Sequence, residues 1–168
     1  PQEVLGNTES SQSVRNLLAK KISEGTFMVN FIGHGSEQRW TEETVLDLAF
    51  IRDLANRDRL PVFVTATCEF GRYDDPTLIA DRSESGAEKL LLKPEGGAIA
   101  LITTTRPVYA FTNYDVNRAF HFFLMRALED GPEAGKLPRL GDIIKETKNN
   151  SLSGAVNRNF ALLGDPML

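Results

Sequence analysis

The chain has 168 residues, of which 41% are hydrophobic and 25% are charged, and its formal net charge is −4. These values are ordinary for one soluble globular domain, so we expect residues 1–168 to belong to a single domain with one core. The acidic balance, with no Lys/Arg cluster to offset it, argues against a nucleic-acid partner. The longest apolar runs fall far short of the roughly 18 residues that a membrane span needs.

Two single positions add further constraints. The chain begins with Pro1 and shows neither an initiator Met nor a signal segment, so we expect it to be a portion of a longer precursor. Cys68 is the only cysteine, which excludes an internal disulfide and a cysteine-based metal cluster. A lone cysteine is either a small buried apolar residue or a reactive thiol, and the residue type alone favours burial.

The first half of the chain predicts alternating helices and strands. Polar residues at 10–13 can cap a helix with apolar side chains at positions 14, 17, 18 and 22, and Gly25 ends that helix. The mostly apolar run 27–32 predicts a buried strand. Residues 42–56 have the apolar spacing of one helix or two short ones. The second buried strand, residues 62–67, leads directly into Cys68.

The second half continues the alternation. Residues 69–81 are polar and rich in turn formers, which predicts a loop. A helix over 83–92, a third strand over 98–103, an amphipathic helix over 113–128 and another helix over 140–148 follow. A short apolar run at 160–163 precedes a turn at 164–166. This order predicts an α/β fold with a parallel sheet, helices on its faces, and chemistry at the carboxyl ends of the strands.

The only cysteine and one of the two histidines fall at the ends of successive predicted strands. His34 follows the first strand in the sequence Gly33-His34-Gly35, and Cys68 follows the second. If these strands are neighbours, both side chains emerge at one edge of the sheet. A tight turn and a core cysteine are the plainer interpretations of each residue by itself. The joint placement favours a functional pair.

The chemistry of a nucleophilic cysteine explains why this pairing matters. A free thiol has a pKa of about 8.5, and an adjacent imidazole increases its thiolate fraction at neutral pH. We therefore predict that Cys68 is a nucleophile and that His34 is its base and later its proton donor. Glycines on both sides of His34 permit close approach of a substrate carbonyl. The amides of Gly35 and Cys68 can then donate to a developing oxyanion.

Other candidate residues lie around this pair. We predict that Gly33, Glu69 and Tyr109 contact substrate, Tyr109 from the rim that follows the third strand. Asp74, Asp75 and Asp81 carry oxygen ligands suited to calcium, but a solvated loop is the favoured interpretation, and we expect no cofactor or metal. His121, beside Phe120 and Phe122 in an amphipathic helix, is expected to be structural. No dinucleotide, P-loop or serine-hydrolase motif is complete.

Three segments resemble a known family. They are Phe31-Ile32-Gly33-His34-Gly35-Ser36, Ala66-Thr67-Cys68-Glu69-Phe70 and Gly97-Ala98-Ile99-Ala100-Leu101-Ile102, and together they resemble the gingipain family of clan CD cysteine peptidases. Two segments, residues 65–76 and the ending Leu162-Leu163-Gly164-Asp165-Pro166-Met167-Leu168, are most similar to the PorU-type sortase branch, which serves the type IX secretion system. The resemblance extends from about Val14 to Leu168.

The resemblance implies a fold, an activity and a location. The fold is a caspase-like three-layer α/β sandwich with a mainly parallel sheet. Residues 1–168 match the C-terminal portion of one peptidase domain, so we expect this chain to lack the first strands of the family's sheet. The Cys-His dyad of the family matches Cys68 and His34. The sortase branch implies cleavage of C-terminal sorting domains from secreted cargo through a Cys thioester, with a lipopolysaccharide amine as a possible acceptor. It also implies other secretion-system partners and the outer-membrane surface or extracellular space of a Bacteroidetes-type bacterium.

Two other functions stay open on the sequence alone. One is a secreted gingipain-like endopeptidase that cleaves after basic residues, and the other is a catalytically silent binding module of the same fold. In gingipains the acid that orients the histidine and the main determinant of the S1 pocket lie upstream of the matched segment. We therefore expect both to be absent from this chain, and we expect an exposed sheet edge with a tendency to self-associate.

Overall fold

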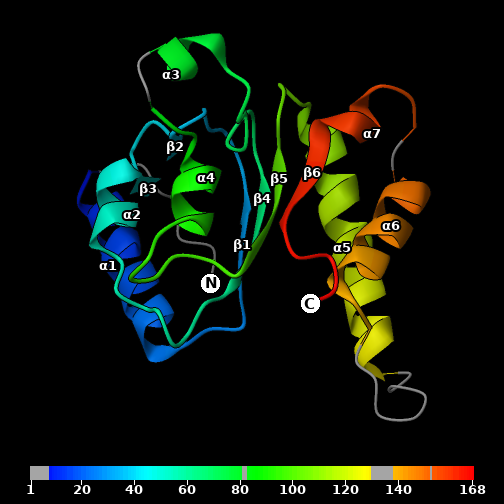
Figure 1. Cartoon of the computed structure of the whole chain (residues 1–168), viewed down its shortest axis with the longest axis horizontal. Coiled ribbons are helices and arrows are strands. Elements are labelled where there is room, and N and C mark those ends of the chain that lie inside the picture. Colours follow the sequence, from blue (N-terminus) through cyan, green and yellow to red (C-terminus); the bar gives the residue numbers. More distant parts are fainter. Residues whose placement is uncertain (1–7, 81–82, 130–137, 152) are drawn as a thin grey trace.

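The computed structural model describes residues 8–80, 83–129, 138–151 and 153–168 (Figure 1). Its centre is a four-stranded sheet in the order β1 (Met28–Ile32), β4 (Val62–Ala66), β5 (Ala100–Thr104) and β6 (Phe160–Gly164). The pairs β1–β4 and β4–β5 are parallel, and β5–β6 is antiparallel. The sheet is thus mainly parallel, as the alternation of elements predicts.

Helices cover both faces of this sheet. Figure 1 shows α1 (Thr8–Glu24), α2 (Leu48–Asp53) and α4 (Gly86–Leu91) on one side, and α5 (Ala110–Glu129) and α6 (Leu140–Ser151) on the other. Because side chains alternate along a strand, Phe63 of β4 packs into the core beneath α1, α2 and α4, whereas Val64 packs beneath α5 and α6. The three-layer α/β class is confirmed.

The segment between β1 and β4 differs from its prediction. Residues 42–56 were expected to form one helix or two short ones, but they begin with a turn and then form β3 (Leu46–Asp47), which pairs with β2 (Arg39–Trp40) in a separate antiparallel ribbon. Only α2 is helical there. The Asp47 side chain accepts a hydrogen bond from the Phe50 amide at 2.7 Å, which starts α2 directly after the strand. The apolar residues of 42–56, although spaced as in a helix, therefore lie partly in a short strand and partly in a short helix.

Two more local differences lie later in the chain. The predicted loop 69–81 contains a short helix, α3 (Pro76–Ala80), which begins because Asp75 accepts hydrogen bonds from the amides of Thr77 and Leu78. The apolar run 160–163 is the antiparallel edge strand β6, preceded by α7 (Val156–Asn159). Beyond β6, the Pro166 carbonyl accepts from the Gly141 amide at 2.9 Å, so the chain end closes the first turn of α6.

A cluster of aromatic rings packs on the face of β1 and β4 that α1, α2 and α4 cover. Trp40, 2% exposed, stacks on Phe31 with ring centroids 4.5 Å apart and an interplanar angle of 3°. Phe63 and Phe70 contact the same indole at 5.9 and 5.7 Å. Because Phe70 is two residues after Cys68 and fully buried, this cluster anchors the segment that carries the only thiol. No helix of the described part is long and apolar enough to span a bilayer.

Replacing Phe70 with alanine is expected to lower the free energy of unfolding by about 3–5 kcal/mol, because it leaves a cavity beside Trp40 into which the neighbouring side chains can relax only in part. Urea unfolding followed by circular dichroism measures the change. Phe122→Ala is the matched control: that ring is 58% exposed, so its loss should cost less than about 1 kcal/mol. Equal losses for the two variants would show that Phe70 is not an anchor.

Candidate active site

His34 and Cys68 follow the ends of neighbouring parallel strands. Every residue of β1 pairs with the residue 34 positions later in β4, from Met28 with Val62 to Ile32 with Ala66. His34 and Cys68 are separated by that same number of positions. The Gly33 amide still donates to the Ala66 carbonyl at 3.3 Å, which continues the ladder one residue beyond the strands. The adjacency of the two strands, on which the predicted pair depends, is therefore confirmed.

The segment after β1 is a tight hairpin that presents His34. The Thr41 amide donates to the His34 carbonyl at 2.9 Å, and the Ser36 amide donates to the Arg39 carbonyl at 3.0 Å. These two bonds flank the bridge between Gly35 and Trp40, so the Gly35 amide is directed away from the hairpin partner. His34 is exposed, and the hairpin bonds do not use the Gly35 amide, but the roles of base and oxyanion donor stay predictions.

Gly35 has no space for a side chain. A methyl group there would overlap Thr67 Oγ1 and come within 2.9 Å of the Arg39 carbonyl oxygen. The backbone of the histidine loop therefore lies directly against the residue that precedes Cys68. Thr67 is fully buried, and its carbonyl accepts a hydrogen bond from Thr104 Oγ1. Thr67 is therefore held both by Thr104 of β5 and by its packing against Gly35.

Cys68 is half-buried, and a third loop reaches it. Its Sγ donates to the Val108 carbonyl at 3.5 Å, in the segment between β5 and α5. The next residue, Tyr109, is 67% exposed and stacks on Phe111 with centroids 5.6 Å apart. The structure therefore places the Tyr109 segment beside the thiol, where the sequence predicted a substrate wall.

The remaining predicted substrate residues lie at the same edge. Gly33 is half-buried in the ladder described above. Glu69 has a left-handed backbone with φ of 58°, and its carboxylate binds Arg72 Nη1 at 2.7 Å. The carboxylate is therefore engaged within the protein. The roles of Gly33, Glu69 and Tyr109 stay predictions.

The first turn of α4 holds both loops of the predicted pair. The Gly86 amide donates to the Glu37 carbonyl at 2.7 Å, and the Ala87 amide donates to the Phe70 carbonyl at 3.1 Å. The next free amide of the turn, that of Glu88, is capped by the Ser85 hydroxyl at 3.3 Å. Helix amides that need acceptors outside the helix thus take them from the loops after His34 and after Cys68. Sequence analysis identified the helix but not this function of its first turn.

The residues considered for calcium have other partners. Arg106 makes a two-pronged ion pair with Asp74 at 2.8 and 2.6 Å, and this hydrogen bonding lowers the pKa of Asp74. Desolvation raises the pKa of Asp75, but amide hydrogen bonds from Thr77 and Leu78 and the charge of Arg72 outweigh it, so the net shift is downward. Asp81 lies outside the described residues. Within the described ranges, no group of three or more His, Cys, Asp or Glu side chains is arranged to hold a metal.

The second histidine lies on α5 and not on either loop of the predicted pair. His121 is half-buried on α5, with Nδ1 2.8 Å from the Asn117 carbonyl and its ring edge-to-face with Phe120. Intrahelical bonding and aromatic packing agree with the structural role expected for it.

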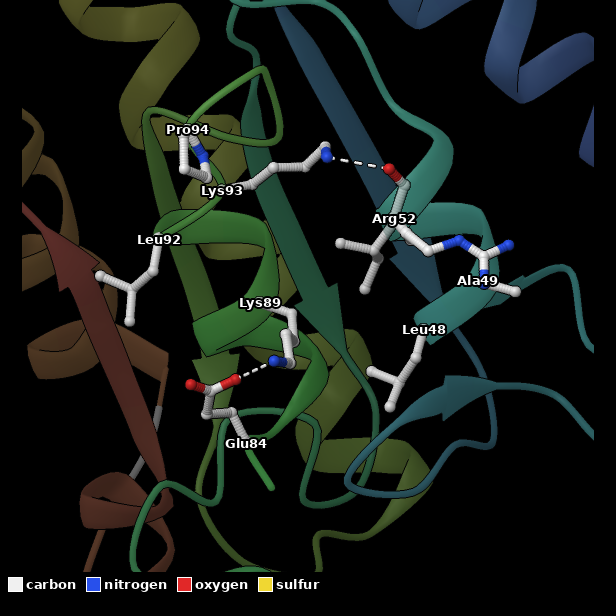
Figure 2. Close-up of a pocket in the computed structure, with 9 residues that line it drawn as sticks. Leu48, Ala49, Arg52, Glu84, Lys89, Leu92, Lys93 and Pro94 are labelled. Atoms are coloured by element: carbon white, nitrogen blue, oxygen red, sulfur yellow. Dashed lines mark hydrogen bonds and ion pairs between the residues drawn. The ribbon is translucent and has the colours of Figure 1, made fainter. Parts of the chain in front are cut away.

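A recess of about 480 Å³ lies between α2 and α4, and it contains none of the predicted site residues (Figure 2). Figure 2 shows the side chains of Leu48 and Leu92 on opposite walls of it. Its cations have partners: Lys93 Nζ donates to the Arg52 carbonyl at 2.8 Å, and Lys89 pairs with Glu84. The recess is therefore a groove between helices with its charges paired, separate from the thiol.

Comparison with known proteins establishes the family. The model of peptidase family C25 matches residues 2–168, so the chain belongs to peptidase family C25. No curated protein sequence matches it significantly.

Three solved structures share the fold. The chain superposes on the Arg-specific cysteine proteinase gingipain R (RgpB) with a TM-score of 0.75 and 20% identity, covering 92% of this chain and 35% of that one. For the complex of the pro- and mature domains of RgpB from Porphyromonas gingivalis, the TM-score is 0.73, with 17% identity and 92% and 36% coverage. For a third structure, described as a protease, the TM-score is 0.63 and the identity 16%, and the match covers 88% of this chain and 36% of that one. The chain thus has the gingipain fold and spans about a third of the length of these proteins.

Gly35→Ala is expected to destabilise the protein by about 1–3 kcal/mol, because the added methyl group would overlap Thr67 and also crowd the Arg39 carbonyl. Denaturant unfolding measures the change. Thr67→Ala in the same chain should restore at least about half of the loss, since Thr67 Oγ1 is buried without a hydrogen-bond partner among the described residues and its removal costs little. Ser36→Ala, one residue away, serves as the control. If the losses in unfolding free energy of the two single variants simply add in the double variant, Gly35 and Thr67 are not closely packed.

Proposed function

We propose that this chain carries the nucleophile and the general base of a cysteine peptidase, with Cys68 and His34 in those roles. The observation that carries the proposal is the parallel register of β1 and β4, because it brings the segments after both strands to one edge. Membership of peptidase family C25 and the gingipain fold support it. A silent binding module would have no use for an exposed imidazole and a half-buried thiol at that edge.

The proposed reaction uses the groups at this edge in sequence. The thiol proton moves from Cys68 to the His34 imidazole, and Sγ attacks the substrate carbonyl carbon. The amides of Gly35 and Cys68 donate to the oxygen as it becomes negative. The peptide C–N bond then breaks, and the leaving amine takes the proton from His34. The acyl group remains on Sγ as a thioester, which water or an amine resolves.

We further propose that the physiological reaction is that of a sortase, in which C-terminal sorting domains of secreted cargo are removed. The similarity of residues 65–76, which surround Cys68, to the PorU-type branch supports it. In this proposal a lipopolysaccharide amine can resolve the thioester, other secretion-system proteins are partners, and the site of action is the outer-membrane surface or the extracellular space. No cofactor is required. The alternative is a gingipain-like endopeptidase, which the fold likeness to an Arg-specific proteinase favours.

His34→Ala is expected to slow alkylation of Cys68 by iodoacetamide at about pH 7 by roughly tenfold or more, because the imidazole no longer shares the thiol proton. Since Cys68 is the only thiol, intact-mass spectrometry of the 168-residue chain gives the rate directly. His121→Ala should leave the rate within about twofold. Equal rates for the unaltered chain and His34→Ala across the pH range would rule out the pair.

Cleavage in the presence of a small primary amine separates the two enzymatic proposals. For the full-length protein, we expect the new carboxyl end of the cargo to carry the added amine, such as glycinamide, because the thioester is open to aminolysis. Mass spectrometry of the product measures the ratio of amide to acid. Only hydrolysed product, cut after basic residues, would favour the gingipain-like endopeptidase. Unimpaired processing by Cys68→Ala would exclude both.

A further inference from the structure

Arg72 connects the loop after β1 to the loop after β4. Its Nη1 lies 2.7 Å from Glu69 Oε1, 3.2 Å from Asp75 Oδ2 and 3.7 Å from Glu37 Oε1. Glu69 directly follows Cys68, whereas Glu37 is three residues after His34. One guanidinium therefore contacts side chains from both loops of the proposed Cys-His pair.

These ion pairs are partly shielded from water. The side chains of Arg72, Glu69 and Glu37 are 29%, 19% and 29% exposed, and that of Asp75 is 10% exposed. Coulombic attraction is larger here than between fully exposed side chains. Arg72 Nε is buried and has no hydrogen-bond partner among the described residues, so the guanidinium is held through Nη1. The position of Arg72 is therefore defined by the carboxylates of both loops.

The charge balance makes the loops depend on Arg72. Three carboxylates surround one guanidinium, so its removal would leave like charges close together across the two loops. Glu69 also has the left-handed backbone noted above, which is unfavourable for a residue with a side chain. The Arg72 amide donates to the Glu69 carbonyl at 2.9 Å, in addition to the ion pair, so Arg72 holds both ends of Glu69.

We propose that Arg72 is a positioning residue for the reaction: by binding Glu69 and Glu37 together, it fixes the loop of Cys68 against the loop of His34. The first turn of α4 binds the same two loops through backbone carbonyls, and Arg72 adds a bridge through side chains. The inference rests on the proposed function, because positioning has consequences only if Cys68 and His34 react together.

The test compares the pH dependence of iodoacetamide alkylation in the 168-residue chain and two variants. Arg72→Ala should slow alkylation at about pH 7 by roughly tenfold, with less than about twofold change at about pH 10, where the thiolate forms without help from His34. Each variant changes one charged group and leaves the remaining charged or titratable groups of the three loops that meet at Cys68 unchanged. These groups are His34, Glu37, Glu69, Arg72, Tyr73, Asp74, Asp75, Arg106 and Tyr109.

Glu37→Gln distinguishes positioning from a simple charge effect. If Arg72 acts by joining the loops, Glu37→Gln also slows alkylation near neutral pH, and the double variant adds little to either change. If Arg72 acts only through its positive charge, loss of the Glu37 carboxylate favours the thiolate and speeds alkylation. Faster alkylation in Glu37→Gln would therefore overturn the proposal.

Two further variants complete the test. Arg106→Ala is the control: it also removes one positive charge and breaks an ion pair, here with Asp74, and the alkylation rate should stay within about twofold of that of the unaltered chain. Arg72→Lys keeps the positive charge but carries it on a shorter side chain that cannot place a nitrogen where Nη1 lies between the two loops, so it should recover only part of the rate. Thermal unfolding monitors folding of every variant, and if Arg72→Ala does not fold, Glu37→Gln decides. Failure of His34→Ala to slow alkylation refutes the pair itself, whereas failure of Arg72→Ala and Glu37→Gln alone refutes only the positioning role.

Discussion

The parallel pairing of β1 with β4 is the constraint on which the rest of the structure depends. A shift of one residue would turn either Val29 or Phe63, depending on which strand moves, from the core under α1, α2 and α4 toward the opposite face. Burial of these side chains therefore fixes the register. Because the register also brings the segments of His34 and Cys68 together, the energetics of the core determine the geometry of the proposed site. The register alone therefore holds the segments of His34 and Cys68 at one edge.

Backbone groups that lack partners in regular structure complete the site. The first amides of α4 bind carbonyls of the loops after β1 and β4, and Thr104 binds the carbonyl that precedes Cys68. Each of these bonds satisfies a buried polar group that would otherwise cost free energy. The loops are thus ordered by the same hydrogen-bonding requirement that ends strands and begins helices. A rigid frame of this kind suits a reaction whose donor amides must be preorganised.

The family likeness has different meanings in different segments. Residues 65–76 contain Cys68, Glu69 and Arg72, so similarity there concerns the proposed chemistry. The ending Leu162–Leu168 contributes to β6 and supplies the Pro166 carbonyl that closes α6. Similarity in that segment therefore reflects the shared fold. For this reason the sortase proposal depends on the region around the thiol and not on the chain end.

The sequence by itself determined the three parallel strands β1, β4 and β5, the long helices and the placement of the Cys-His candidates, because continuous apolar runs and helical apolar patterns are local properties. Only the tertiary structure decided the β2–β3 ribbon, the short helix α3 and the antiparallel direction of β6, since two-residue strands and edge pairing depend on distant partners. The Arg72–Glu37 contact joins residues 35 positions apart, so no spacing rule could reveal it. Contacts of this kind arise when independent loops meet at one sheet edge, and their pairing is fixed by folding.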